Sequence, residues 1–82
     1  MSEMKVIVVS PEKTLYSGDA ERVEVPGTKG RFEVLRHHAP IVSSLTEGVV
    51  KVSGEAPAEF AIKGGFVEVS ADCVNVCVEE RN

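Results

Sequence analysis

The sequence has no long apolar run and no secretory signal. None of its apolar stretches approaches the about 18 residues that a helix needs to span a bilayer. The first residues, Met-Ser-Glu-Met-Lys, lack the charged-then-apolar pattern of an export signal. These absences predict a cytosolic protein that reaches a membrane only by binding to another protein.

Blocks of like charge are also missing. The chain has 13 acidic and nine basic residues, which give a net charge of −4 and are spread along its length. Without a basic face, a protein has little electrostatic attraction for nucleic acid or anionic lipid. We therefore expect neither of these as a partner.

Residues for metal binding and nucleophilic catalysis are scarce. Cys73 and Cys77 would lie on one face of a strand, about 13 Å apart at the usual rise, which is too far for a disulfide. The spacing also fits no zinc motif, so both cysteines are predicted to be reduced packing residues. His37 and His38 are adjacent and point to opposite sides of an extended chain, and no Gly-x-Ser-x-Gly elbow surrounds a serine. The sequence therefore predicts no catalytic, cofactor or metal site.

Few stretches of the sequence without glycine or proline are long enough to form a helix. The seven glycines and four prolines interrupt almost every stretch, and 15 valines stand against three leucines and three isoleucines. This excess of β-branched residues favours strands. Alternating segments are predicted at residues 4–10, 15–20, 22–25, 31–35, 41–45, 49–52, 58–62, 66–70 and 73–79. The pattern is typical of an all-β flattened sandwich or barrel of about nine or ten short strands, with no C-terminal helices, in a single domain over residues 1–82.

Two stretches are candidates for function. The corner at residues 36–40 lies between two predicted strands, where binding residues are often placed, and Pro40 stiffens it. His38 is either an interface residue or a histidine that ties its own loop. Lys63, before Gly64-Gly65 at a predicted hairpin, is similar to the modified lysine of lipoyl and biotinyl carrier domains, but its flanking residues differ from theirs. A small carrier or ligand-binding domain is therefore the alternative function.

Five motifs occur in an order that covers essentially the whole chain. They are Ser-Pro-Glu-Lys-Thr-Leu-Tyr-Ser-Gly at residues 10–18, Val-Pro-Gly-Thr-Lys-Gly at 25–30, His-Ala-Pro at 38–40, Leu-Thr-Glu-Gly at 45–48 and Gly-Gly-Phe-Val-Glu-Val at 64–69. Together they closely resemble the epsilon subunit of F-type ATP synthase, whose N-terminal domain is a β-sandwich. The resemblance implies a non-catalytic rotor subunit of the central stalk, without a cofactor of its own, at the cytoplasmic face of the bacterial inner membrane.

The resemblance also implies two contact sets, for the gamma subunit and for the membrane ring of c subunits. The expected c-ring contacts are Thr28, Lys29, Gly30 and Arg31. The expected gamma contacts are Ser10, His38, Ala39, Pro40, Ile41, Val42 and Ser43.

The sequence departs from the family pattern in three places. Members usually carry an acid at Arg31, a glycine at Glu33, and often a glycine or asparagine at His37. The reversed charge at Arg31 predicts that its partner loop is not the usual basic one. Most bacterial members also continue into a two-helix hairpin that can inhibit hydrolysis, whereas this chain ends at Asn82. We expect a subunit that couples and assembles without inhibiting by helix insertion.

Overall fold

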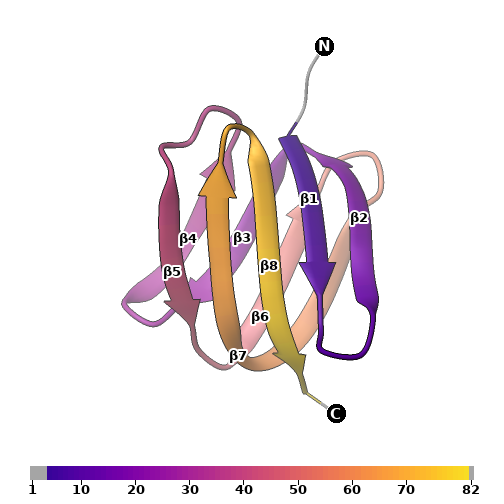
Figure 1. Cartoon of the computed structure of the whole chain (residues 1–82), viewed down its shortest axis with the longest axis vertical. Coiled ribbons are helices and arrows are strands. Elements are labelled where there is room, and N and C mark those ends of the chain that lie inside the picture. Colours follow the sequence, from indigo (N-terminus) through magenta and orange to yellow (C-terminus); the bar gives the residue numbers. More distant parts are fainter. Residues whose placement is uncertain (1–3, 82) are drawn as a thin grey trace.

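The computed structural model describes residues 4–81, which form eight strands in two facing layers (Figure 1). The strands are β1 (Met4–Val9), β2 (Thr14–Ala20), β3 (Arg22–Gly27), β4 (Gly30–Leu35), β5 (Ile41–Leu45), β6 (Gly48–Ser53), β7 (Ala58–Ser70) and β8 (Cys73–Glu80). No helix occurs in residues 4–81. The all-β sandwich prediction is confirmed.

The front layer of Figure 1 contains β2, β1, β8, the second half of β7, and β5, in that order. Its pairings are antiparallel except for β1 with β8, which run parallel. The back layer contains β4, β3, β6 and the first half of β7. Strand β7 therefore belongs to both layers and carries the chain from one to the other.

The core between the layers consists mainly of valine. Because side chains alternate between the two faces of a strand, every second residue of most strands points inward. The buried apolar residues are Met4, Val6, Val8, Ala20, Val23, Val25, Val34, Leu45, Val50, Val52, Ile62, Val67, Val69, Val74, Val76 and Val78. The valine pairs and triplets that the alternation predicts to face the core are confirmed.

The hairpin predicted at Lys63-Gly64-Gly65 is wrong. Strand β7 runs through these residues as one 13-residue strand, and its register with β8 shifts between Ile62 and Gly64. Gly65 has φ +148°, and a β-carbon there would collide with the carbonyl oxygen of Cys77. The two glycines therefore allow a bulge and a close backbone approach. Residues 4–81 therefore form eight strands, because residues 58–62 and 66–70, expected as two strands, form one.

Exchanging each glycine for alanine tests this role of the bulge. We expect Gly65→Ala to lower the free energy of unfolding by about 3 kcal/mol, because the new β-carbon meets backbone in a region that side chains rarely adopt. Gly64→Ala is the matched control, since its β-carbon would lie 3.4 Å from the carbonyl oxygen of Leu45, an ordinary contact. Its cost should stay within about 1 kcal/mol. Urea unfolding measures both, and equal losses would contradict this account.

Candidate functional site

The outer face of the front layer presents a row of apolar side chains. The strand register places Val9 beside Cys77, and Cys77 beside Phe66. In the next outward-facing row, Ile7 of β1 and Val42 of β5 lie at the two ends, with the polar residues Asn75 of β8 and Glu68 of β7 between them. Phe66 is 47% exposed and Val42 is 70% exposed, while Val9, Cys77 and Ile7 are half-buried. We call these last five residues the apolar face.

A hollow of about 490 Å³ opens at one end of the apolar face. Its lining includes the apolar residues Val9, Pro11, Phe66 and Cys77, together with Ser10 and Glu79. Exposed apolar side chains that gather beside a hollow often mark a contact with another protein. This face is therefore the strongest candidate for a protein interface in the part of the chain that the structure describes.

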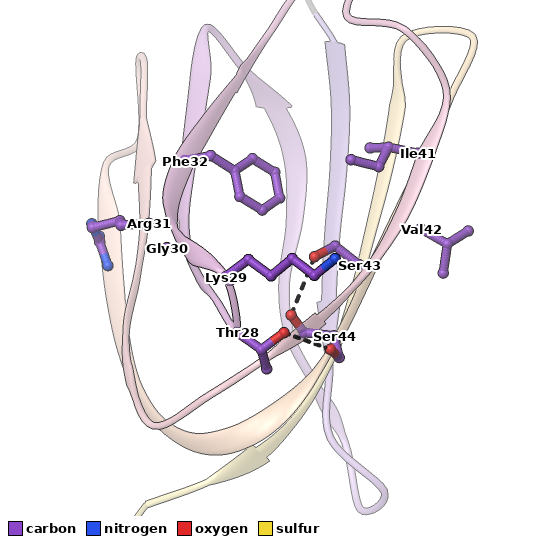
Figure 2. Close-up of a pocket in the computed structure, with 10 residues that line it drawn as sticks. Thr28, Lys29, Gly30, Arg31, Phe32, Ile41, Val42, Ser43 and Ser44 are labelled. Atoms are coloured by element: carbon purple, nitrogen blue, oxygen red, sulfur yellow. Dashed lines mark hydrogen bonds between the residues drawn. The ribbon is translucent and has the colours of Figure 1, made fainter.

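A second hollow, of about 550 Å³, lies between the β3–β4 turn and strand β5 (Figure 2). It brings residues 28–32 together with residues 41–44. The Thr28 and Ser44 hydroxyls are 2.9 Å apart, and the Thr28 N–H donates to the Ser44 carbonyl oxygen at 3.1 Å. The Lys29 side chain extends across the hollow in the direction of β5. The turn is thus fixed to β5, and the hollow carries one lysine.

The structure brings part of the two predicted contact sets together. All four predicted c-ring residues lie at the β3–β4 turn, and Ile41 and Ser43 face the same hollow. Val42 points to the opposite side and belongs to the apolar face. Ser10 follows the end of β1, whereas His38 precedes the start of β5, so these two lie at opposite ends of the front layer (Figure 1). The predicted gamma set therefore spreads along the whole layer.

Two residues of that set are bonded within their own loops. The Ser10 hydroxyl accepts from the backbone N–H groups of Glu12 and Lys13 at 3.3 and 3.2 Å, which caps the β1–β2 turn. The His38 Nδ1–H donates to the carbonyl oxygen of Ala39 at 2.7 Å. Of the two interpretations of His38, the contact supports the histidine that ties its own loop.

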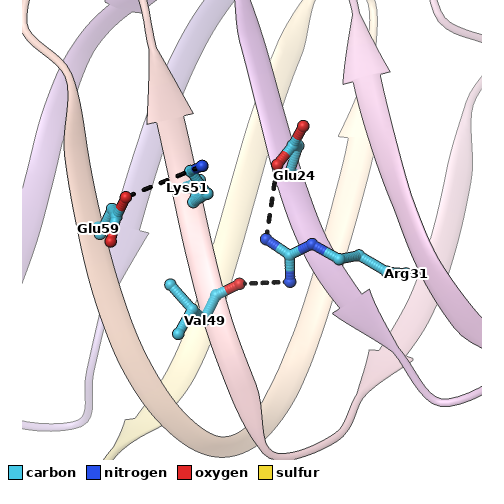
Figure 3. Close-up of polar contacts among 5 residues, drawn as sticks. All are labelled: Glu24, Arg31, Val49, Lys51 and Glu59. Atoms are coloured by element: carbon cyan, nitrogen blue, oxygen red, sulfur yellow. Dashed lines mark hydrogen bonds and ion pairs between the residues drawn. The ribbon is translucent and has the colours of Figure 1, made fainter.

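Arg31 points away from the hollow and is held by the back layer (Figure 3). Its Nη1–H donates to the carbonyl oxygen of Val49 at 2.8 Å, and its Nη2 lies 3.6 Å from a Glu24 carboxylate oxygen. Pairing between β3 and β6 ends at Glu24 and Lys51. Two residues further along the same register, Pro26 would lie opposite Val49. Proline has no N–H to donate. The guanidinium therefore supplies the carbonyl of Val49 with a donor that β3 lacks.

Several residues of this site escaped the sequence analysis. Val6 to Val9 is apolar on both faces, which predicts a strand covered on two sides, but the outer face with Ile7 and Val9 is only half-buried, so that prediction is wrong. The outward position of Phe66 was not predicted, although the alternation that buries Val67 and Val69 also turns Phe66 outward. Cys73 was predicted to pack and is exposed, so that prediction is wrong, whereas Cys77 is half-buried in the apolar face. Lys63 lies within β7 and not at a hairpin tip, which removes the main support for a carrier domain.

Within residues 4–81, no three His, Cys, Asp or Glu side chains are grouped closely enough to hold a metal ion. A helix with the length and apolarity to cross a membrane is likewise not found there.

A family model described as the ATP synthase delta/epsilon chain β-sandwich domain matches residues 3–81. The chain belongs to this family. It is similar to the ATP synthase epsilon chain of Leptospira interrogans, with 37% identity over 79 residues that cover 95% of this chain and 62% of the relative. The epsilon chain of Caulobacter vibrioides is 38% identical over 80 residues, which cover 96% of this chain and 93% of the relative. The chain thus spans about 62% of the Leptospira relative's length.

Solved structures of ATP synthases contain the same fold. A chain in the central stalk and c-ring structure of Tetrahymena thermophila mitochondrial ATP synthase aligns with a TM-score of 0.82 and 18% identity, covering 96% of this chain and 65% of that one. A chain in the Euglena gracilis mitochondrial ATP synthase structure aligns with a TM-score of 0.88 and 19% identity, covering 98% of this chain and 52% of that one. At these identities the comparison shows a shared β-sandwich.

Replacing Arg31 tests its role within this epsilon-type sandwich. Arg31→Met should lower the free energy of unfolding by about 1 kcal/mol, because the carbonyl of Val49 loses its donor. For a domain of this size that corresponds to about 4–8 °C in Tm. Lys51→Met is the matched control, since Lys51 makes only an exposed ion pair, at 3.9 Å, with Glu59 (Figure 3). Its effect should stay within about 0.5 kcal/mol. Calorimetry that found the two losses equal would refute the role given to Arg31.

Proposed function

We propose that this domain is a non-catalytic central-stalk subunit of an F-type ATP synthase that binds the gamma subunit and rests on the c-ring. In this role it would couple ion translocation to ATP synthesis by keeping the two partners together. It would lie at the cytoplasmic face of the bacterial inner membrane and be held there only through the complex. Family membership, the names of the relatives and the shared fold support the proposal.

The observation that carries the gamma contact is the apolar face. Phe66, Val9 and Val42 are partly exposed apolar side chains on the outer side of the front layer, and the inner side of this layer contributes most of the core. Aromatic and aliphatic side chains at the centre of an interface supply most of its binding free energy. The sheet beneath them is rigid, so little entropy is lost when it docks. A subunit that transmits torque benefits from the same rigidity.

The c-ring contact is assigned to the β3–β4 turn. Thr28, Lys29 and Gly30 form its tip, and Gly30 adopts φ +131°, which favours glycine. Lys29 extends over the open hollow, whereas the Arg31 guanidinium lies against the back layer. Charge at this contact would therefore come from Lys29 and not from Arg31. A basic residue at position 31, where the resemblance implies an acid, then need not change the c-ring contact, because the Arg31 guanidinium interacts with Val49 and Glu24 of the same chain.

A charged residue in the apolar face should prevent gamma binding. We expect Phe66→Glu to weaken the affinity for the cognate gamma subunit by about 100-fold, because a carboxylate would be buried without a partner. Val49→Glu is the control, since Val49 is 36% exposed on β6 in the back layer. Isothermal titration calorimetry compares the three chains. The proposed face is wrong if Val49→Glu weakens binding and Phe66→Glu does not.

The two basic residues of the β3–β4 turn should differ in their effect on the c-ring. Lys29→Glu should weaken binding of the chain, in complex with gamma, to purified c-ring by about three- to tenfold, with a loss that shrinks at high salt. Arg31→Met should leave this affinity unchanged, because its guanidinium is engaged within the chain. Surface plasmon resonance at two salt concentrations measures both. The opposite ranking would assign the contact to Arg31.

A further inference from the structure

The loop that leads into β5 starts with a conformation that its sequence does not favour. The His38 N–H donates to the carbonyl oxygen of Leu35 at 3.1 Å and closes a tight turn. The third residue of this turn, His37, has φ +69°. Such turns favour glycine or asparagine at that position, because a β-carbon makes the left-handed conformation costly. Something outside the turn must therefore stabilise His37.

Asp72 supplies that stabilisation from the other end of the sequence. Its Oδ1 accepts a hydrogen bond from the His37 backbone N–H at 2.7 Å, and its Oδ2 lies 3.5 Å from the His37 Nδ1. The hydrogen bond from the His37 N–H is the contact that can hold the backbone of His37, and it is short and charge-assisted. The Asp72 side chain is 33% exposed, so neighbouring residues partly shelter this contact from water.

Asp72 is itself fixed in place by the front layer. It lies in the tight β7–β8 turn, where Ala71 and Asp72 have φ +49° and +62°. Its carbonyl oxygen accepts from the Lys5 N–H of β1 at 2.9 Å. A continuous set of bonds therefore leads from β1 through the β7–β8 turn to His37, and from there to the loop that precedes β5.

We propose that Asp72 is a positioning residue for the gamma contact. By holding His37 in the left-handed conformation, it sets the direction in which residues 38–43 leave the turn, and it keeps this loop in its binding conformation before the partner arrives. A loop that is already ordered loses less entropy on binding. The inference rests on the proposed function, because residues 38–43 include most of the expected gamma contacts.

The test removes the carboxylate without disturbing the turn that carries it. Asp72→Gly keeps a residue that tolerates positive φ, and Ala71→Gly is the matched control at the neighbouring position. Asp72→Gly should weaken gamma binding by about tenfold and speed amide exchange of His37 and His38 in the free chain by about tenfold. Ala71→Gly should change neither quantity. Asp72→Asn should retain most of the affinity, because its amide oxygen can accept from the His37 N–H.

Substitution at His37 tests whether Asp72 acts on gamma binding through the backbone conformation of His37. Glycine adopts the left-handed conformation at little cost, so His37→Gly should reduce the need for Asp72. In that background, Asp72→Gly should weaken gamma binding by about twofold at most, compared with about tenfold in the wild-type background. Equal losses in both backgrounds would overturn the inference.

The remaining outcomes separate this inference from the proposed function. Failure of the wild-type chain to bind gamma would count against the proposed function. Amide exchange in the free chain would still test whether Asp72 holds the His37 backbone. Wild-type binding with an unchanged affinity for Asp72→Gly, whether or not exchange accelerates, would overturn the positioning role. A loss for Asp72→Asn equal to that for Asp72→Gly would also overturn it. If Asp72→Gly does not fold, amide exchange of the wild-type chain decides: the His37 amide should be protected although His37 is exposed, and unprotected exchange would overturn the inference.

Discussion

The close approach of Gly65 to the carbonyl of Cys77 is the constraint on which the sandwich depends. It allows β7 to pass through a bulge and continue from the back layer into the front layer. Three pairings use this one strand, with β6 before the bulge and with β5 and β8 after it. Phe66, the largest side chain of the apolar face, directly follows Gly65. The bulge thus builds the fold and positions the proposed gamma contact.

Two departures from the family pattern are compensated within this chain. Arg31 stands where the resemblance leads us to expect an acid, and its guanidinium lies beside Glu24 and donates to the carbonyl oxygen of Val49. His37 stands where glycine or asparagine is frequent, and Asp72 holds it in the required conformation. In each case a carboxylate from a neighbouring strand or turn stabilises the unusual residue. The surfaces proposed for partners are the apolar face, the loop at residues 38–43 and the tip of the β3–β4 turn.

The fold class and the core could be predicted from the sequence, because alternating valines allow only one side of each strand to be buried. The role of Gly64-Gly65 could not, since a glycine pair fits a turn and a bulge equally well and the choice depends on pairing with distant β8. The direction of Arg31 depends on Pro26 lacking an N–H opposite Val49. The contact of Asp72 with His37 joins residues 35 positions apart and appears only when the strands are paired.

The most direct test of the proposed docking is a structure of this chain bound to the gamma subunit and c-ring of its own complex. Gamma should cover Phe66 and Val42 on the front layer, with the tip formed by Thr28, Lys29 and Gly30 against the ring and the Arg31 guanidinium still on Val49. A chain that bound gamma through the back layer, with Phe66 left in solvent, would contradict it.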